Sequence, residues 1–179
     1  MSRTAHIALL ARYNEWMNNK LYEAAAALPA KELTADRGAF FGSLLATLNH
    51  IAVADTIWLK RIGVHPRFAA ALAPVLALPA PIALDQPLFD SLPALREHRA
   101  WLDRLILDWS AGLTEADLDA VISYRRMNGE ANQRQLGLLV LHFFNHQTHH
   151  RGQATTLLSQ AGVDVGTTDL LLLVPEAEV

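Results

Sequence analysis

The segment 141–153, LHFFNHQTHHRGQ, contains four of the eight histidines of this chain. If the segment is a helix, His146 and His150 lie one turn apart on the same face, where two imidazoles can bind one metal ion. A helical wheel places both rings within an apolar stripe that includes Leu139 and Phe143. Burying two imidazoles there is costly unless each ring nitrogen has a partner. A divalent metal ion would be a partner for both.

A third histidine could complete such a site from another part of the chain. His50 lies on the inner flank of a predicted helix that begins after Ser43 and ends near Ile62. A single buried histidine more often has a backbone carbonyl as its partner, whereas a one-turn pair on an apolar face favours a metal ion. An HxxxH pair alone is nevertheless a weak signal. Three neutral imidazoles from two helices would hold an ion and leave positions for water and substrate. Nitrogen ligands without thiolates suit Zn²⁺ or Ni²⁺, with Fe²⁺, Mn²⁺ or Co²⁺ also possible.

The residues around the histidines exclude two familiar kinds of metal centre. A zincin protease helix reads HExxH, but Gln147 stands where that motif needs its glutamate. Ferritin-like di-iron bundles need several inward glutamates, and the apolar stripe carries none. Asp55 points away from His50 on the wheel, so we expect it to form a salt bridge and not to act as a base. The chain has no cysteine and no recognisable serine triad, so it supplies no nucleophile of its own.

Four predicted helices would position these residues. Apolar side chains recur at helical spacing in four segments, about Ala5–Leu28, Ser43–Ile62, Ser91–Gly112 and Gln135–Ala161. Six of the eight prolines lie between Pro66 and Pro93, so we expect no helix there and a long crossover on the outside of the bundle. Asn128-Gly129 predicts a hairpin over about Asp119–Arg134. The predicted fold is an all-α four-helix bundle, with the crossover between its second and third helices and the hairpin before its fourth.

Two shorter features flank the last predicted helix. Thr114 to Asp117 resembles the cap of a short extra turn ahead of the hairpin. After the helix, the tail carries an apolar patch at Leu170 to Val174. An exposed patch of this kind favours aggregation, so we expect it to dock on the body of the protein or on a second subunit.

Composition narrows the classes of function. A chain of 179 residues is most simply one domain over 1–179. Its net charge is −3 and it has no run of basic residues, so the sequence offers no positively charged surface for nucleic acid. No apolar run approaches the ~20 residues that a membrane span requires, and the first residues lack the pattern of a signal peptide. With no cysteine to form disulfides, we expect a cytoplasmic protein without a membrane or nucleic-acid partner.

Several stretches together resemble a known family. Residues 145–153 (NHQTHHRGQ), Leu48–Ile51, Asp55–Leu59 and Tyr13–Trp16 are similar to the DinB/YfiT-like family of metalloenzymes. The similarity extends over nearly the whole chain. It implies an up-down-down-up four-helix bundle, commonly a homodimer, with a divalent metal on three histidines. By position those ligands are His50, His146 and His150.

The resemblance also implies a range of activities. Characterised members include thiol-dependent transferases and an isomerase that use mycothiol, bacillithiol or glutathione. No catalytic signature in this sequence selects one of these activities or one of these thiols.

Five further polar residues are candidates for the site. Asn14 could contact a metal-bound water or form a hydrogen bond across the bundle. His98 could supply a fourth ligand or a proton shuttle. His142 and His149 fall at the margin of the apolar stripe, where they could support the ligands or lie at an interface. Arg151 could bind a substrate carboxylate or form a salt bridge.

Three hypotheses follow for the function. The first is an enzyme whose metal binds a thiol or water, lowers its pKa and presents it to a small electrophile, giving thiol transfer or hydrolysis. The second is a non-catalytic stress-response bundle with a structural or sensory metal, whose site a fourth ligand such as His98 would close. The third is a plain dimeric bundle with buried, hydrogen-bonded histidines.

Overall fold

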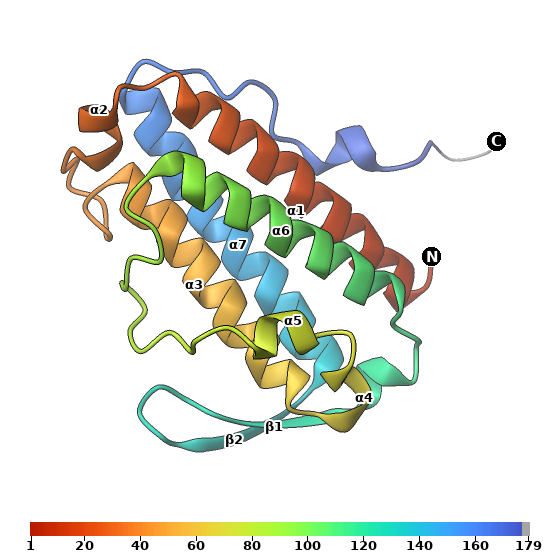
Figure 1. The fold of residues 1–179 in the computed structure, drawn as a ribbon. Helices are drawn as coiled ribbons and strands as arrows, with labels where there is room; N and C mark the ends of the chain where they lie inside the picture. The colour runs from red at the N-terminus through yellow and green to blue at the C-terminus, as the bar shows by residue number, and fades with distance from the viewer. Residues whose placement is uncertain (177–179) are drawn as a thin grey trace.

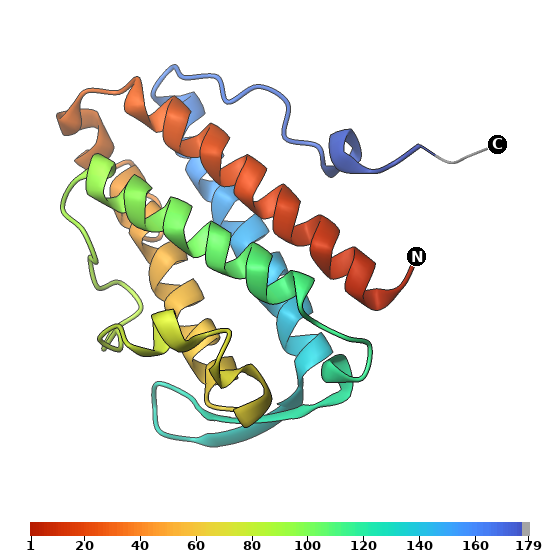
Figure 2. The same ribbon diagram turned by 45° about the vertical axis from the view of Figure 1, so that its right-hand side comes forward.

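The structure, a computed structural model, describes residues 1–176 and is mostly helical with a small antiparallel sheet (Figure 1). Four long helices correspond to the predicted ones: α1 (Arg3–Ala26), α3 (Leu44–Gly63), α6 (Leu92–Ala111) and α7 (Leu136–Gln160). Helices α1 and α7 run in the direction opposite to α3 and α6 (Figures 1 and 2). One cluster of buried apolar side chains draws on all four. Within residues 1–176, no helix has the length and apolarity needed to cross a membrane.

Local sequence signals explain where the long helices begin and end. The hydroxyls of Ser2 and Ser43 accept hydrogen bonds from the amides of Ala5 and Ala46, which caps the first turns of α1 and α3. Gly162 follows α7 with a φ of +79°, a conformation that glycine adopts without strain. The predicted helix start after Ser43 and the predicted helix end near Ala161 are therefore confirmed.

The proline-rich crossover differs from the prediction that it holds no helix. It contains two single helical turns, α4 (Pro66–Ala69) and α5 (Ala73–Leu76). Pro66 and Pro74 lie in their first turns, where a missing N–H breaks no helical hydrogen bond. The turns pack on α3 and bury Phe68 and Val75. A further short helix, α2 (Ala30–Thr34), lies between α1 and α3.

The predicted hairpin is present. The chain turns through the 3₁₀ helix η1 (Asp117–Asp119) into β1 (Val121–Arg125), which pairs in antiparallel register with β2 (Ala131–Gln135). Gly129 in the connecting turn has a φ of +84°. The sheet lies across the end of the helices where α3 ends and α7 begins (Figure 1).

The tail docks on α1, and part of its apolar patch stays exposed. The Tyr13 hydroxyl donates a hydrogen bond to the Thr168 carbonyl at 2.7 Å, and the 3₁₀ helix η2 (Leu170–Leu173) contacts α1. Leu171 and Leu172 nevertheless remain 76% and 61% exposed. A contact of this patch with a second subunit stays a prediction.

Candidate metal centre

Three histidines meet between two of the long helices. His50 comes from the second turn of α3, and His146 and His150 come from successive turns of α7, which packs against α3. The Nε2 atom of His150 lies 3.2 Å from Nε2 of His50 and 3.1 Å from Nε2 of His146. Their ligand atoms all lie within 4.8 Å of one another, so the three histidines are positioned to bind a metal ion.

Hydrogen bonds on the far side of two rings determine which nitrogen faces the centre. His50 Nδ1 lies 2.8 Å from the Leu84 carbonyl oxygen, and His150 Nδ1 lies 2.7 Å from Oε1 of Gln153. These oxygens only accept, so each Nδ1 carries the hydrogen and each neutral ring directs an unprotonated Nε2 inward. Two such lone pairs cannot form a hydrogen bond with each other. A cation between them satisfies both, so the residues present fit a divalent metal ion.

Burial keeps the three rings in the neutral form. It lowers the pKa of His50 and His150 below the ordinary value and lowers the pKa of His146 to about 3. Repulsion between neighbouring imidazoles adds to the effect at His146 and His150. Neutral imidazole is the form that binds metals, so the ligand set is ready for an ion at neutral pH.

Residues outside the two helices complete the surroundings of the rings. The Phe41 ring, from the loop before α3, stacks on His50 with centroids 4.0 Å apart and covers it. Asn49 accepts hydrogen bonds from the amides of Leu88 and Phe89 at 2.8 and 3.1 Å. Asn49 thereby ties the crossover to α3, and the same crossover carries the Leu84 carbonyl that orients His50.

A pocket of 590 Å³ opens beside the histidines. His50 and His146 line it together with the apolar side chains of Trp58 and Leu139 and with Tyr124 of the hairpin. A small molecule in this pocket would therefore lie beside two of the three histidines.

Comparison with known families matches residues 1–177 to the DinB family. This chain belongs to the DinB family. A solved structure with a similar fold is that of a DinB-like protein from Bacillus cereus ATCC 10987, with a TM-score of 0.60 and 20% sequence identity. The similarity covers 84% of this chain and 89% of that one. No curated protein matches the sequence.

In this DinB-family chain, two of the further candidates lie in a buried polar network and not among the histidines. The Asn14 amide donates to Asp103 at 3.0 Å, and its oxygen accepts from the Arg151 guanidinium. Arg151 also donates to Gln147 and Thr148, and burial lowers its pKa to about 10. Asn14 therefore bonds across the helices, and Arg151 is buried where a substrate carboxylate does not reach it.

The remaining candidates surround the centre at different distances. His142 lines the pocket and packs edge-on against Trp58, with ring centroids 5.1 Å apart. His149 packs edge-on against His150 at 4.8 Å. His98 is separate, because it lies against Phe89 and Trp101 and outside the three-histidine group found within residues 1–176.

Three contributors were missing from the sequence-based prediction. Gln153 lies one helical turn after His150, so i,i+3 spacing could have found it as the residue that orients that ring. The Leu84 carbonyl and the Phe41 ring had no such signal, because both contact His50 from irregular segments outside α3.

Proposed function

We propose that this DinB-family protein is a metal-dependent enzyme that acts on small electrophiles by thiol transfer or hydrolysis. The observation that carries the proposal is the convergence of three Nε2 atoms at the edge of a 590 Å³ pocket. A divalent ion held there, most favourably Zn²⁺ or Ni²⁺, would lower the pKa of a thiol or a water molecule.

The protein's own side chains would prepare this chemistry. The Leu84 carbonyl and the Gln153 amide hold the rings of His50 and His150 with Nε2 inward. The pocket walls, including Trp58, would hold the apolar part of a substrate beside the centre. The chain has no cysteine, so a thiol would come from a low-molecular-weight cosubstrate.

The position of His98 supports an enzyme over a structural or sensory metal site. The second hypothesis expects a fourth protein ligand, and His98 was its leading candidate. His98 instead packs against Phe89 and Trp101, while His50 and His146 border a pocket. A site that borders a pocket can admit a substrate.

We also propose the architecture and assembly that the resemblance implies. The directions of α1, α3, α6 and α7 support an up-down-down-up four-helix bundle (Figure 1). The exposed Leu171 and Leu172 are compatible with a homodimer. Size-exclusion chromatography with light scattering tests the dimer.

Metal analysis tests the ligand assignment. Protein purified without a histidine tag should contain about one divalent ion per chain by elemental analysis, and His146→Ala should lose most of it. His142→Ala is the matched control on the same helix, and it should keep its metal. Full metal content in His146→Ala would show that the ligand assignment is wrong.

An activity screen tests the reaction. The metal-loaded protein is incubated with glutathione, bacillithiol or mycothiol and a generic electrophile such as 1-chloro-2,4-dinitrobenzene. We expect product formation with at least one thiol and its loss in His146→Ala. Silence across all thiols, with metal bound, would favour the non-catalytic alternative.

A further inference from the structure

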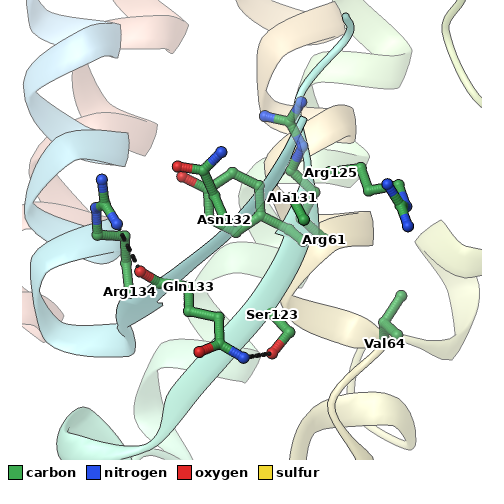
Figure 3. A pocket seen from close by; sticks show the side chains of 9 residues that line it. Arg61, Val64, Ser123, Arg125, Ala131, Asn132, Gln133 and Arg134 are labelled. Atoms are coloured by element: carbon green, nitrogen blue, oxygen red, sulfur yellow. Dashed lines mark hydrogen bonds between the residues drawn. The ribbon is translucent and has the colours of Figure 1, made fainter. Parts of the chain in front are cut away.

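Arginines gather around the pocket beside the histidines. Arg61 of α3 and Arg126 and Arg134 of the hairpin line it together with His50 and His146. A second pocket of 730 Å³ lies at the hairpin and shares Arg61 and Arg134 with the first (Figure 3). Within the described part of the chain, no aspartate or glutamate lines either pocket. Positive charge is thus concentrated here in a protein whose net charge is −3.

Arg61 lies against two aromatic rings. Its guanidinium lies 4.7 Å from the ring centroid of Trp58 and 5.2 Å from that of Tyr124. Burial lowers its pKa, but a guanidinium remains charged at neutral pH. Among residues 1–176, no carboxylate pairs with Arg61, so its planar donors remain available to a ligand.

The two hairpin arginines that line the pocket beside the histidines, Arg126 and Arg134, have few partners within the protein. Arg134 donates from Nη1 to the carbonyl of its neighbour Gln133 at 2.7 Å (Figure 3), which leaves its other donors free. Arg126 pairs with Glu130 at 3.1 Å, but both side chains are more than half exposed. Such a surface pair contributes little and can exchange for another anion.

We propose that this pocket binds an organic anion with an apolar or aromatic body. Its oxyanion group, a carboxylate or a phosphate, bonds to Arg61 and Arg134, while its body packs on Trp58 and Leu139. The rest of the molecule then extends toward His50 and His146. If the proposed enzymatic function holds, on which this step rests, the substrate is an anionic electrophile. Binding of the anion itself does not depend on turnover.

Calorimetric titration of the metal-free protein with 2-naphthoate tests the anion site. We expect Arg134→Gln and Arg61→Gln each to weaken binding about tenfold or more, because a charge-assisted hydrogen bond is lost. Arg104→Gln, which removes an exposed arginine of α6, is the matched control and should bind as the wild type does. The neutral 2-naphthamide should bind more weakly than 2-naphthoate, and Arg134→Gln should not alter its affinity.

The relative affinities of these ligands show which group of the ligand the pocket recognises. Tighter binding of 2-naphthyl phosphate than of 2-naphthoate identifies a phosphate site, and the reverse identifies a carboxylate site. Equal affinity for 2-naphthoate and 2-naphthamide would overturn the proposal. So would affinities within twofold of wild type in both arginine variants. Using two arginine variants keeps the test decisive if Arg61→Gln disturbs the packing of Trp58.

Failure of this inference differs from failure of the proposed function. If 2-naphthoate binding depends on the arginines but the protein neither holds a metal nor turns over a substrate, the anion site stands and the enzymatic proposal fails. The opposite outcome is that Arg61→Gln and Arg134→Gln turn over a neutral electrophile at the wild-type rate and bind 2-naphthoate with wild-type affinity. The enzymatic proposal would then be supported and the anion site would be refuted.

Discussion

Two groups of polar side chains lie between the long helices, and their polar atoms face different kinds of partner. In the network around Asp55, carboxylates face donors: Asp55 pairs with Arg99 and accepts from Gln147 at 2.7 Å. Asp103 pairs with the same Arg99 at 2.9 Å. In the three-histidine group, the unprotonated Nε2 atoms of His50 and His150 face each other at 3.2 Å.

The difference separates buried polar side chains that stabilise the fold from side chains that are arranged to bind a ligand. The network finds its ion-pair and hydrogen-bond partners within α1, α3, α6 and α7, so it can hold these helices together without a ligand. In the histidine group, a cation from outside the chain would satisfy the facing lone pairs of His50 and His150. Sequence neighbours such as His146 and Gln147 belong to different groups because each step along a helix rotates the side chain by ~100°.

The largest effect should come from breaking the network. Asp55→Ala leaves the buried Arg99 guanidinium without one of its two carboxylates and should lower the free energy of unfolding by about 3–5 kcal/mol. Urea unfolding of the metal-free protein measures this change. The control is Asp108→Ala, which removes an exposed carboxylate from α6, the helix that carries Arg99. It should change the free energy of unfolding by less than about 0.5 kcal/mol. Similar losses in both variants would mean that the network does not stabilise the fold.

Supplying a cation to the histidine group should have the next largest effect. At a free Zn²⁺ concentration of 100 times the dissociation constant, the free energy of unfolding should rise by about 2.7 kcal/mol. Thermal unfolding with Zn²⁺ and with a chelator measures the shift. His150→Ala should lose it and His142→Ala should keep it. A zinc-induced shift that survives in His150→Ala would place the metal elsewhere.

Removing the orientation of one ring should have a smaller effect. Gln153→Ala deletes the acceptor at 2.7 Å from His150 Nδ1, so the ring is no longer held with Nε2 inward. We expect zinc affinity to fall about tenfold, with the binding stoichiometry unchanged. Competition with a chromophoric chelator measures the affinity. Gln160→Ala, at the exposed end of α7, is the control, and equal affinity of the two variants would refute this role of Gln153.

The smallest effect concerns His98, a half-buried imidazole outside both groups. Burial, with the nearby positive charge of Arg99, lowers its pKa to about 4, against about 6.5 in the unfolded chain. Between these pH values the unfolded chain takes up a proton that the folded chain does not, so stability falls as pH decreases through this window. Because His98 is partly exposed, we expect a contribution of about 1 kcal/mol at pH 5.

Urea unfolding at pH 7 and pH 5 tests this assignment. From pH 7 to pH 5, the free energy of unfolding of His98→Gln should fall by about 1 kcal/mol less than that of the wild type. His6→Gln, which removes an exposed histidine near the N-terminus, should follow the wild type. Parallel losses in wild type and His98→Gln would contradict the assignment.

The sequence by itself determined the features that depend on local periodicity. Helical spacing placed His146 and His150 on one face of α7, and Asn128-Gly129 marked the hairpin turn. His50 was identified by its flank on a second helix and by the family resemblance. The prediction failed in the crossover, where prolines in first turns permit the short helices α4 and α5.

Only the tertiary structure decided what these residues contact. A wheel places Asn14 and His98 on apolar faces and Arg151 at a polar margin. The packing of several helices decides that Arg151 is buried and bonds to Asn14, and that His98 lies apart. The Leu84 carbonyl reaches His50 from 34 positions away. Orientation of the rings and charge around the pocket depend on contacts between segments distant in sequence, which local periodicity does not encode.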